Sequence, residues 1–325
     1  EDRVIVLPDR DRDGRRDPLP TGTVGSALTF AQGQGLNRPW GLAFGPDALY
    51  VACTDGLWAF SYAAGQLAAT GRPRRLMDLP GADPNWERGL ARAADGRLFV
   101  SIGSPCQSCE PEDARLASVL SLDPVSGQVT RFAAGLRRSL DLAVHPRTGE
   151  LFAPDQGREG LGDHLPPDEV NRLVQGAHFG WPSCFGAALP DPQADAPPAE
   201  GFCAATTAPL LELEAHSALS GLLFYTGGQF PADYRGDLYI VSHGSDARRE
   251  LPVGYSVLRI PMQGGLPRGE VFDFVSGWLR PDTRRWGSPV DLAEAADGSL
   301  LISDDRGGRI YRVFSTQPSP TPPAP

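Results

Sequence analysis

A short repeated unit, a turn dipeptide followed by a strand of alternating pattern, most constrains how this chain folds. The unit occurs five times, at Pro46–Val51, Asp95–Ser101, Thr148–Ala153, Gly236–Ser242 and Asp297–Ser303. A second short strand precedes most copies, and a third follows several of them. Strand units that recur at intervals of roughly 50 to 90 residues are typical of a β-propeller, whose blades are small antiparallel sheets.

We therefore predict an all-β fold, a six-bladed β-propeller with long inserted loops. Five units are visible, the interval between Gly149 and Gly236 is long enough to contain a sixth, and Arg3–Leu7 could add a strand that closes the ring. A β-sandwich and two stacked β domains are the alternatives. Asp168–Gln175 is the only segment that favours a short helix.

The predicted organisation is a single propeller domain over residues 1–314, followed by a tail over residues 315–325. The tail sequence STQPSPTPPAP is Pro-rich and has no apolar anchor, which is typical of a disordered end or a linker. Glycine (38) and proline (32) together make up about a fifth of the 325 residues. This content disfavours long helices and favours short strands joined by turns.

Charge and hydropathy exclude several classes of function. The formal net charge is −10, with no long basic stretch, so nucleic acid is not an expected partner. All 30 cationic side chains are arginine, which excludes chemistry that requires a lysine. No apolar run is long enough for a transmembrane helix. The chain begins at Glu1 without Met or an apolar segment, and we expect a mature form whose signal peptide has been removed.

The five cysteines indicate an oxidising compartment. Cys106 and Cys109 form a CxxC motif with no second CxxC in the chain, so we expect a local disulfide rather than a redox motif or half of a zinc site. Cys184 and Cys203 are expected to form a second disulfide, and Cys53 to be a buried thiol. Two disulfides favour a periplasmic or secreted protein of the cell envelope.

Several segments, taken together and in order, resemble a known family. They are Leu36–Phe44, Gly103–Cys109, Gly157–Glu169, Gly180–Cys184, Ala215–Ala218, Phe224–Gly227, His243–Ser245 and Ser303–Asp305. In these segments the chain resembles the soluble quinoprotein sugar dehydrogenases, in particular the sorbosone dehydrogenase-like branch of the glucose/sorbosone dehydrogenase family. The resemblance covers nearly the whole chain. It implies a six-bladed propeller that binds pyrroloquinoline quinone (PQQ) and calcium and oxidises a sugar hydroxyl by hydride transfer to the quinone.

The catalytic motif of the family is changed in this chain. The resemblance implies a general-base histidine that opens a motif H-W-x-R-x-L, and the matching stretch here is Asn85–Leu90. Asn85 replaces the expected His, and an amide does not accept a proton at accessible pH. Arg88 retains the arginine of the motif. We expect Asn85 to be a structural loop residue rather than a catalytic one.

The positions that the resemblance assigns to the trianionic quinone are also changed. Arg137 is retained, Arg138 stands where the family has Asn, and Ser288 stands where it has Arg. The family segment H-G-S-W-N-R has become His243–Arg248, which keeps His243 and Arg248 but loses Trp and Asn. Because arginine is the preferred partner of a carboxylate, these changes weaken the expected cofactor site.

Two segments are candidate metal sites. The first has carboxylates and a carbonyl at EF-hand-like positions but no final Glu, and its candidate calcium ligands are Asp9, Asp11, Asp13, Arg15 and Asp17. The alternative is a solvated charge run in which the arginines neutralise the aspartates. For the second, the resemblance implies that the carbonyls of Gly157 and Arg158 face a cofactor calcium. Asp168 and Glu169 could bind a structural calcium, or Asp168 could cap the short helix.

Two functions follow from the sequence. The first is a propeller that has lost redox chemistry and has a binding or scaffold role in the cell envelope, with an envelope protein or a sugar as partner. The second is an active, PQQ- and calcium-dependent aldose or sorbosone dehydrogenase with a rearranged site. Calcium is the expected ligand and PQQ the doubtful one, so whether the chain is an enzyme stays open at this point.

Overall fold

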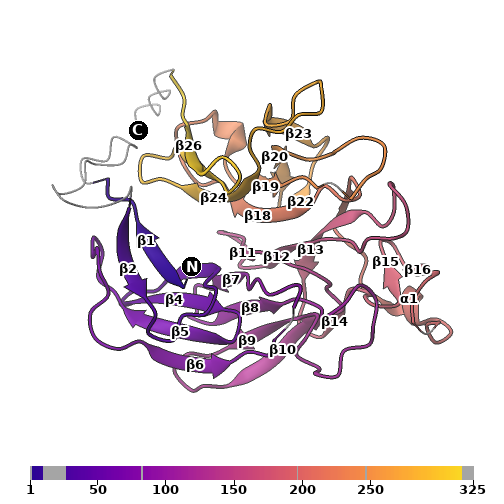
Figure 1. Cartoon of the computed structure of the whole chain (residues 1–325), viewed down its shortest axis with the longest axis horizontal. Helices are drawn as coiled ribbons and strands as arrows, with labels where there is room; N and C mark the ends of the chain where they lie inside the picture. Colours follow the sequence, from indigo (N-terminus) through magenta and orange to yellow (C-terminus); the bar gives the residue numbers. More distant parts are fainter. Residues whose placement is uncertain (1, 10–26, 82, 196, 246, 317–325) are drawn as a thin grey trace.

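The structure is a computed structural model that describes residues 2–9, 27–81, 83–195, 197–245 and 247–316. It is all-β with one short helix, and five antiparallel sheets form the blades of a β-propeller (Figure 1). The first blade contains β3 (Gly41–Phe44), β4 (Ala48–Cys53), β5 (Gly56–Ser61) and β6 (Arg74–Asp78). The second contains β7 (Leu90–Arg92), β8 (Leu98–Ile102), β9 (Ser118–Leu122) and β10 (Val129–Ala134), with β14 (Ala177–His178) at its edge. The third contains β11 (Ala143–Val144), β12 (Leu151–Asp155), β13 (Asp168–Leu173) and β17 (Leu211–Leu213). The fourth blade contains β18 (Leu219–Phe224), β19 (Leu238–Ser242), β20 (Ser256–Ile260) and β23 (Phe272–Val275). The fifth contains β24 (Pro289–Glu294), β25 (Leu300–Asp304) and β26 (Arg309–Val313).

The remaining elements lie outside these blades. They are the hairpins β1 (Arg3–Val6) with β2 (Leu28–Gln32), β15 (Cys184–Phe185) with β16 (Leu189–Pro190), and β21 (Met262–Gln263) with β22 (Leu266–Pro267), the helix α1 (Phe202–Ala205) and a 3₁₀ turn at Ala232–Tyr234. The five repeated units of the sequence correspond to β4, β8, β12, β19 and β25, the second strand of each blade. The propeller prediction is therefore confirmed.

The core lies between successive sheets. Strands β4, β8, β12 and β19 are buried at nearly every position, because both faces of a blade are covered by its neighbours. One apolar cluster joins the first and second blades. Three further clusters join the second to the third blade, the third to the fourth, and the fourth to the fifth. A fifth cluster packs Val4 and Phe30 of the β1–β2 hairpin against Val51 and Phe60 of the first blade. Each sheet thus depends on the next for burial of its apolar side chains.

The prediction of six blades was wrong, since the described residues form five. The interval between Gly149 and Gly236 folds into strands of the second, third and fourth blades and into the small hairpin β15–β16, so it contains no extra blade. Among the strands of the described residues, Arg3–Val6 pairs with β2 in a two-stranded sheet. A hollow of about 790 Å³, lined by residues that include Ile5, Leu7 and Ile310, separates this hairpin from the fifth blade.

The prediction of a helix over Asp168–Gln175 was also wrong. Residues 168–173 form strand β13, which pairs with β12 on one side and β17 on the other. Val170 and Leu173 are buried there, so pairing and burial on both sides outweigh the weak local helix signal. Asp168 consequently does not cap a helix.

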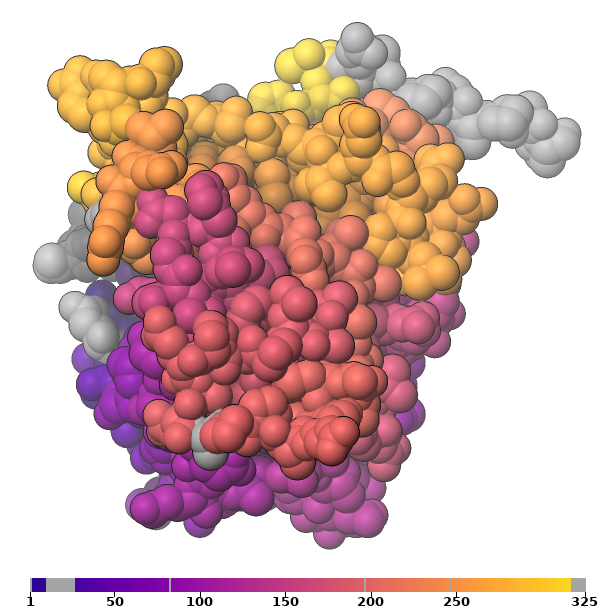
Figure 2. All heavy atoms as spheres, turned by 90° about the vertical axis from the view of Figure 1, so that its right-hand side faces the viewer, coloured from indigo at the N-terminus to yellow at the C-terminus, as the bar shows by residue number. Residues whose placement is uncertain are grey.

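Both predicted disulfides are present, between Cys106 and Cys109 and between Cys184 and Cys203, and Cys53 is a buried thiol. The second disulfide joins the β15–β16 hairpin to α1. Figure 2 shows the long connection between β13 and β18 covering one side of the molecule, in rose and red. No helix in the described part of the chain is long and apolar enough to cross a membrane.

Arg88 fixes the junction of the first two blades. Its side chain is fully buried, and its guanidinium donates to the carbonyl oxygens of Asn85, Glu87, Thr54 and Pro80 at 2.9–3.1 Å. Burial lowers the pKa of Arg88 to about 10, so it remains charged at neutral pH. Arg88 therefore acts as a structural link between loops.

We predict that Arg88→Met destabilises the fold by about 3 kcal/mol or more, because the substitution leaves four buried carbonyl oxygens without a donor. Urea unfolding followed by tryptophan fluorescence measures the effect. Arg72→Met is the matched control, since Arg72 is exposed. Equal midpoints for the two variants would contradict a structural role for Arg88.

Candidate functional site

One face of the propeller gathers the loops that form the site. In each blade the first strand runs antiparallel to the second; for example Ala143 pairs with Phe152. The segments that enter the first strands and those that leave the second strands therefore lie on the same face. They enclose a cavity of about 350 Å³, here called the axial cavity. Its wall includes Trp40, Trp86, Glu87, Arg137, Arg138, Leu140, Gln156, Gly157, Glu159, Asp168, His216, Ala218, Ser220, His243, Gly244, Ser245, Ala247, Val290 and Asp305.

An ion pair between Arg138 and Glu87 crosses this wall. The guanidinium of Arg138 donates to Glu87 Oε1 and, at 3.1 Å, to the amide oxygen of Gln156. The side chain of Glu87 is 8% exposed, and its second oxygen, Oε2, is buried without a hydrogen-bond donor. A buried carboxylate oxygen without a donor is costly. Because Glu87 lines the axial cavity, a hydroxyl of a bound ligand could donate to its carboxylate.

Hydrogen bonds to Asp155, at the end of β12, hold the loop that contains Arg137 and Arg138. The two oxygens of Asp155 accept the backbone N–H groups of Arg137 and Arg138 at 2.8 and 2.6 Å, and the Ser139 hydroxyl at 3.2 Å. Burial raises the pKa of Asp155 to about 7, and these hydrogen bonds oppose the rise. Asp155 therefore sets the position of both arginines.

Arg137 is buried and has neutral oxygen partners. Its guanidinium donates to the carbonyl oxygens of Gln156 and Gly157 at 3.2 and 3.1 Å, and to the side-chain oxygen of Gln107 at 2.8 Å. Burial lowers the pKa of Arg137. The cation thus sits against the Gly157 carbonyl that the resemblance assigned to calcium.

Two indoles form an aromatic part of the wall. Trp40 and Trp86 meet edge to face, with ring centroids 5.6 Å apart. The indole nitrogen of Trp40 donates to the carbonyl of Leu140 at 2.8 Å, which fixes its orientation. Both rings are partly exposed, so they offer a rigid apolar surface in a polar cavity.

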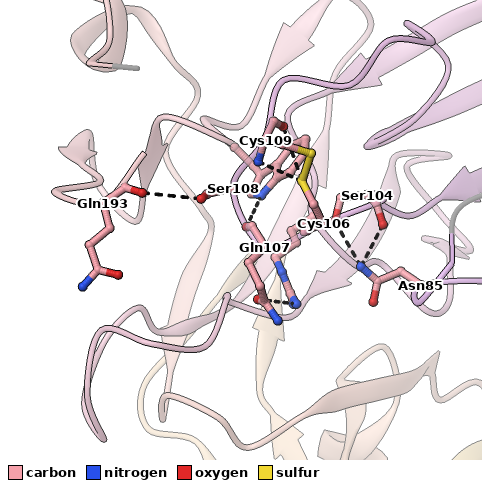
Figure 3. The surroundings of a disulfide bond; sticks show 9 residues. Asn85, Ser104, Cys106, Gln107, Ser108, Cys109 and Gln193 are labelled. Atoms are coloured by element: carbon pink, nitrogen blue, oxygen red, sulfur yellow. Dashed lines mark hydrogen bonds between the residues drawn. A yellow bond between two sulfur atoms is a disulfide. The ribbon is translucent and has the colours of Figure 1, made fainter. Parts of the chain in front are cut away.

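Asn85 does not line the axial cavity. It is 3% exposed, and its amide donates to the backbone oxygen and the hydroxyl of Ser104 at 2.9 and 3.0 Å, beside the Cys106–Cys109 disulfide (Figure 3). The neighbouring residue Gly103 faces it so closely that a Cβ there would lie 2.6 Å from the Asn85 Cβ. Asn85 thus connects two loops, and Arg88 is equally removed from the cavity.

The remaining predicted cofactor residues already have protein partners. The Ser288 hydroxyl donates to the His243 carbonyl at 2.7 Å. His243 lines the cavity and has its Nε2 3.3 Å from Asp305. Arg248 pairs with Glu214 at 2.8 Å and does not line the cavity. The structure therefore brings together Arg137, Arg138 and His243, but not Ser288 or Arg248.

The predicted calcium ligands have protein partners as well. Asp168 accepts hydrogen bonds from the backbone of Gly157, Ala218 and Leu219 and from the Ser217 hydroxyl. Burial raises the pKa of Asp168 and, to about 7, that of Glu169.

Glu169 accepts from Gly186 and Asn171. Arg158 forms an ion pair with Asp191 through its side chain. Within the described ranges no cluster of three or more His, Cys, Asp or Glu side chains could hold a metal. Of the first candidate loop only Asp9 is described, and Asp11, Asp13, Arg15 and Asp17 lie outside the described residues.

Comparison with known proteins supports the family resemblance. A family model described as Glucose / Sorbosone dehydrogenase matches residues 87–247. An uncharacterized protein of Borreliella burgdorferi is 29% identical over 317 residues, which cover 90% of this chain and 82% of that protein. The family-model match contains Glu87, Arg137 and Arg138 of the cavity wall, whereas Trp40, Trp86 and Asp305 lie outside it.

Solved structures share the fold. A calcium structure of a Trichoderma reesei carbohydrate-active enzyme of family AA12 has a TM-score of 0.73 and 21% identity, over 90% of this chain and 85% of that one. The holo form of the PQQ domain of Coprinopsis cinerea pyranose dehydrogenase has a TM-score of 0.71 and 19% identity, over 96% and 92%. A PQQ-bound aldose sugar dehydrogenase from Streptomyces coelicolor has a TM-score of 0.56 and 16% identity, over 88% and 92%. At these identities the likeness shows the propeller fold alone.

The side chains of the axial cavity do not fit a trianionic quinone. Four carboxylates (Glu87, Glu159, Asp168 and Asp305) line the cavity, against two arginines. Arg138 is paired with Glu87, and the Arg137 guanidinium is directed at protein oxygens. A ligand with three carboxylates needs free cationic donors, and an excess of carboxylates repels it.

Sequence reasoning missed the residues that most define the cavity. Glu87 and Trp86 lie inside the Asn85–Leu90 motif, yet only Asn85 and Arg88 were assigned there. Glu87 lies two positions after Asn85, where the general base was expected, and this spacing could have marked it as a candidate site residue. Trp40, Gln156 and Glu159 come from other blades, and no spacing in the sequence joins them.

A carboxylate pair lies below the cavity, next to Leu140 and Val290 of its wall. Asp141 accepts the backbone N–H of Leu222 at 3.0 Å. Asp291, on the innermost strand β24, lies against Gly221 of β18, where a Cβ would be 2.3 Å from its Oδ1. Asp141 is half-buried and Asp291 is exposed by solvent accessibility. Loss of hydration among the surrounding protein atoms, and then the charge of Asp291, raise the pKa of Asp141 well above its usual value, and the same loss of hydration raises the pKa of Asp291. The folded state thus holds protons here that the unfolded chain releases.

We predict that Asp291→Asn raises the thermal unfolding midpoint at pH 8 by about 2 °C or more. Carboxyls with raised pKa values favour the fold when protonated, and this contribution is lost as the pH rises above about 4. Replacing one carboxyl removes the repulsion at high pH, so the gain should disappear near pH 4. Calorimetric scans at both pH values test this, with the exposed Asp47→Asn as control. A gain that is equal at both pH values would contradict the account.

Proposed function

We propose that this chain is a glucose/sorbosone dehydrogenase family propeller that binds a neutral, polyhydroxylated ligand of the sugar class in the axial cavity, without quinone redox chemistry. The family model match and the shared fold support the family assignment. The sorbosone-specific branch remains a prediction. The names of the relatives support the ligand class, since they include pyranose and aldose sugar dehydrogenases.

The Arg138–Glu87 pair carries the proposal. It neutralises the cation that a cofactor carboxylate would need, and it leaves Glu87 Oε2 buried without a donor. Hydroxyl groups of a sugar can supply that donor without adding charge. The Trp40–Trp86 pair adds an apolar surface on the same wall. Together these groups suit a ligand with hydroxyls on its edges and C–H groups on its faces.

A binding role accounts for the changed family positions. Asn85 donates to Ser104, Ser288 donates to His243, and Arg88 is buried among carbonyls. Each of these side chains stabilises loops, so none is available to accept a proton from a substrate. The disulfides support the proposal that the protein works in the periplasm or outside the cell. An envelope protein as a further partner remains a prediction.

An active dehydrogenase is the second candidate, favoured by the match to the family model and by PQQ-bound structural neighbours. In that case Arg138 would have to leave Glu87, and calcium would have to displace Arg137 from the Gly157 carbonyl. Dye reduction with aldoses in the presence of quinone and calcium distinguishes the two candidates. Turnover would support the enzyme, and its absence together with sugar binding would support the binding role.

We predict that neutral hexoses quench or shift the tryptophan fluorescence saturably, and that Glu87→Gln weakens this binding about tenfold. The amide removes the charge paired with Arg138 and one of the acceptors for ligand hydroxyls. Glu270→Gln, an exposed position away from the cavity, should bind as the unchanged protein does. Circular dichroism confirms that each variant is folded. No saturable response in a panel of hexoses, or equal affinity of Glu87→Gln, would contradict the proposal.

A further inference from the structure

His216 lies in the wall of the axial cavity, on a loop with an unusual backbone conformation. The loop Ala215–Ala218 leads into β18, and the φ angles of His216 and Ala218 are both positive, at 62° and 57°. Positive φ angles are uncommon for residues other than glycine, because the Cβ then crowds the backbone. Such conformations persist only where the surrounding structure fixes them, and they cluster at functional sites. The backbone therefore marks His216 as a candidate for function.

Hydrogen bonds from two other segments hold the backbone around His216. Asp168, the first residue of β13, accepts the backbone N–H of Ala218 at 2.6 Å and the Ser217 hydroxyl at 3.2 Å. The Ser245 hydroxyl, from the segment after β19, donates to the carbonyl of His216 at 2.7 Å. The imidazole is thus placed before any ligand arrives, which lowers the entropic cost of binding.

The hydrogen bond made by one ring nitrogen of His216 sets the role of the other. Its Nε2 lies 2.8 Å from the carbonyl oxygen of Gly162. A carbonyl oxygen only accepts hydrogen bonds, so Nε2 carries the proton that is donated. In the neutral ring Nδ1 then has a lone pair and no proton. The Gly162 carbonyl therefore makes Nδ1 a hydrogen-bond acceptor.

This acceptor lacks a partner in the protein. Among the residues that the structure describes, none donates to Nδ1 of His216. The residue is only 6% exposed, yet Nδ1 is not one of the unpartnered side-chain atoms that are fully shielded from solvent. Because His216 lines the axial cavity, we infer that Nδ1 is reached from there. Water or a ligand has to supply the donor, and an acceptor left without one is costly.

The lone pair on Nδ1 selects the kind of ligand group that fits beside it. A hydroxyl donates to it, whereas a carboxylate or carbonyl oxygen would bring a second lone pair against the first. The ionised carboxylates of the cavity wall, such as that of Glu87, also only accept hydrogen bonds. The position beside His216 therefore favours a donor.

We propose that His216 is a specificity-determining residue of the axial cavity, whose Nδ1 accepts a hydrogen bond from one particular hydroxyl of the bound sugar. The inference rests on the proposed sugar-binding function and adds the residue that recognises a single hydroxyl. Because the Gly162 carbonyl and the strained loop hold the ring in one orientation, the ring does not turn to serve another hydroxyl. Sugars that lack this hydroxyl are therefore bound more weakly.

Calorimetric titrations with glucose, galactose and mannose, and with the monodeoxy analogues of whichever binds most tightly, test the inference. We expect one analogue to bind the unchanged protein about tenfold more weakly than its parent hexose, because one hydrogen bond is lost. In His216→Asn the analogue and the parent should bind within about twofold of each other, since the acceptor is gone. Asparagine tolerates a positive φ, and His216→Gly is a second variant that adopts it without strain. His164→Asn is the matched control, since His164 is exposed and does not line the cavity.

Nuclear magnetic resonance tests the same inference on the unchanged protein. Long-range proton–nitrogen spectra of protein labelled with ¹⁵N at histidine should show His216 at pH 8 with Nε2 protonated and Nδ1 unprotonated. Addition of the hexose at saturation should shift the Nδ1 resonance. A protonated Nδ1 in the neutral ring of the free protein would overturn the inference.

The outcomes separate this inference from the proposed function. Monodeoxy analogues that all bind as tightly as the parent hexose would overturn the role of His216 and keep the sugar site. If His216→Asn and His216→Gly weaken the parent and the analogue equally, so that the tenfold difference remains, the role of His216 is structural and the inference fails. Absence of binding by all three hexoses would refute the proposed function, and this inference with it.

Discussion

The ion pair between Arg138 and Glu87 determines what the axial cavity can hold. It joins the loop that leads into β7 to the loop that leads into β11, and so connects two blades across the wall of the cavity. A partly buried pair of this kind is stabilised by additional hydrogen bonds, and here Arg138 donates one to the amide oxygen of Gln156. Breaking the pair to admit a carboxylate would leave Glu87 buried and charged without a partner. The pair that sets the charge of the cavity therefore also holds two blades together.

The propeller could be predicted because its inner strands carry their pattern locally. Strands such as β4 and β8 are buried at nearly every position and follow turn dipeptides, so the sequence marks them clearly. The outer strands were missed, since β6 and β10 are mostly exposed and carry no alternation. The blade count was overestimated because an interval of chain without a clear pattern was assigned to a blade. Residues 168–173 form a strand only because β12 and β17 flank them.

Less of the site could be predicted than of the fold. The two disulfides and the positions of Arg137, Arg138 and His243 were accessible from motifs. The partner of each residue was not, because hydrogen bonds such as that from Asn85 to Ser104 depend on how distant loops meet. Glu87 illustrates the difficulty. Its position in the motif was visible, but its partner Arg138 lies 51 residues away in the sequence. Family motifs thus located the correct face of the molecule but did not identify its chemistry.

The most direct test of this account is a calorimetric titration of the intact protein with PQQ in the presence of excess calcium, beside a parallel titration with a sugar. The account predicts no saturable quinone binding at micromolar concentrations, because Arg138 and Arg137 are engaged by protein oxygens. It predicts saturable binding of the sugar by the same sample. Stoichiometric, calcium-dependent binding of the quinone would contradict the central claim that these cations are unavailable to a trianionic ligand.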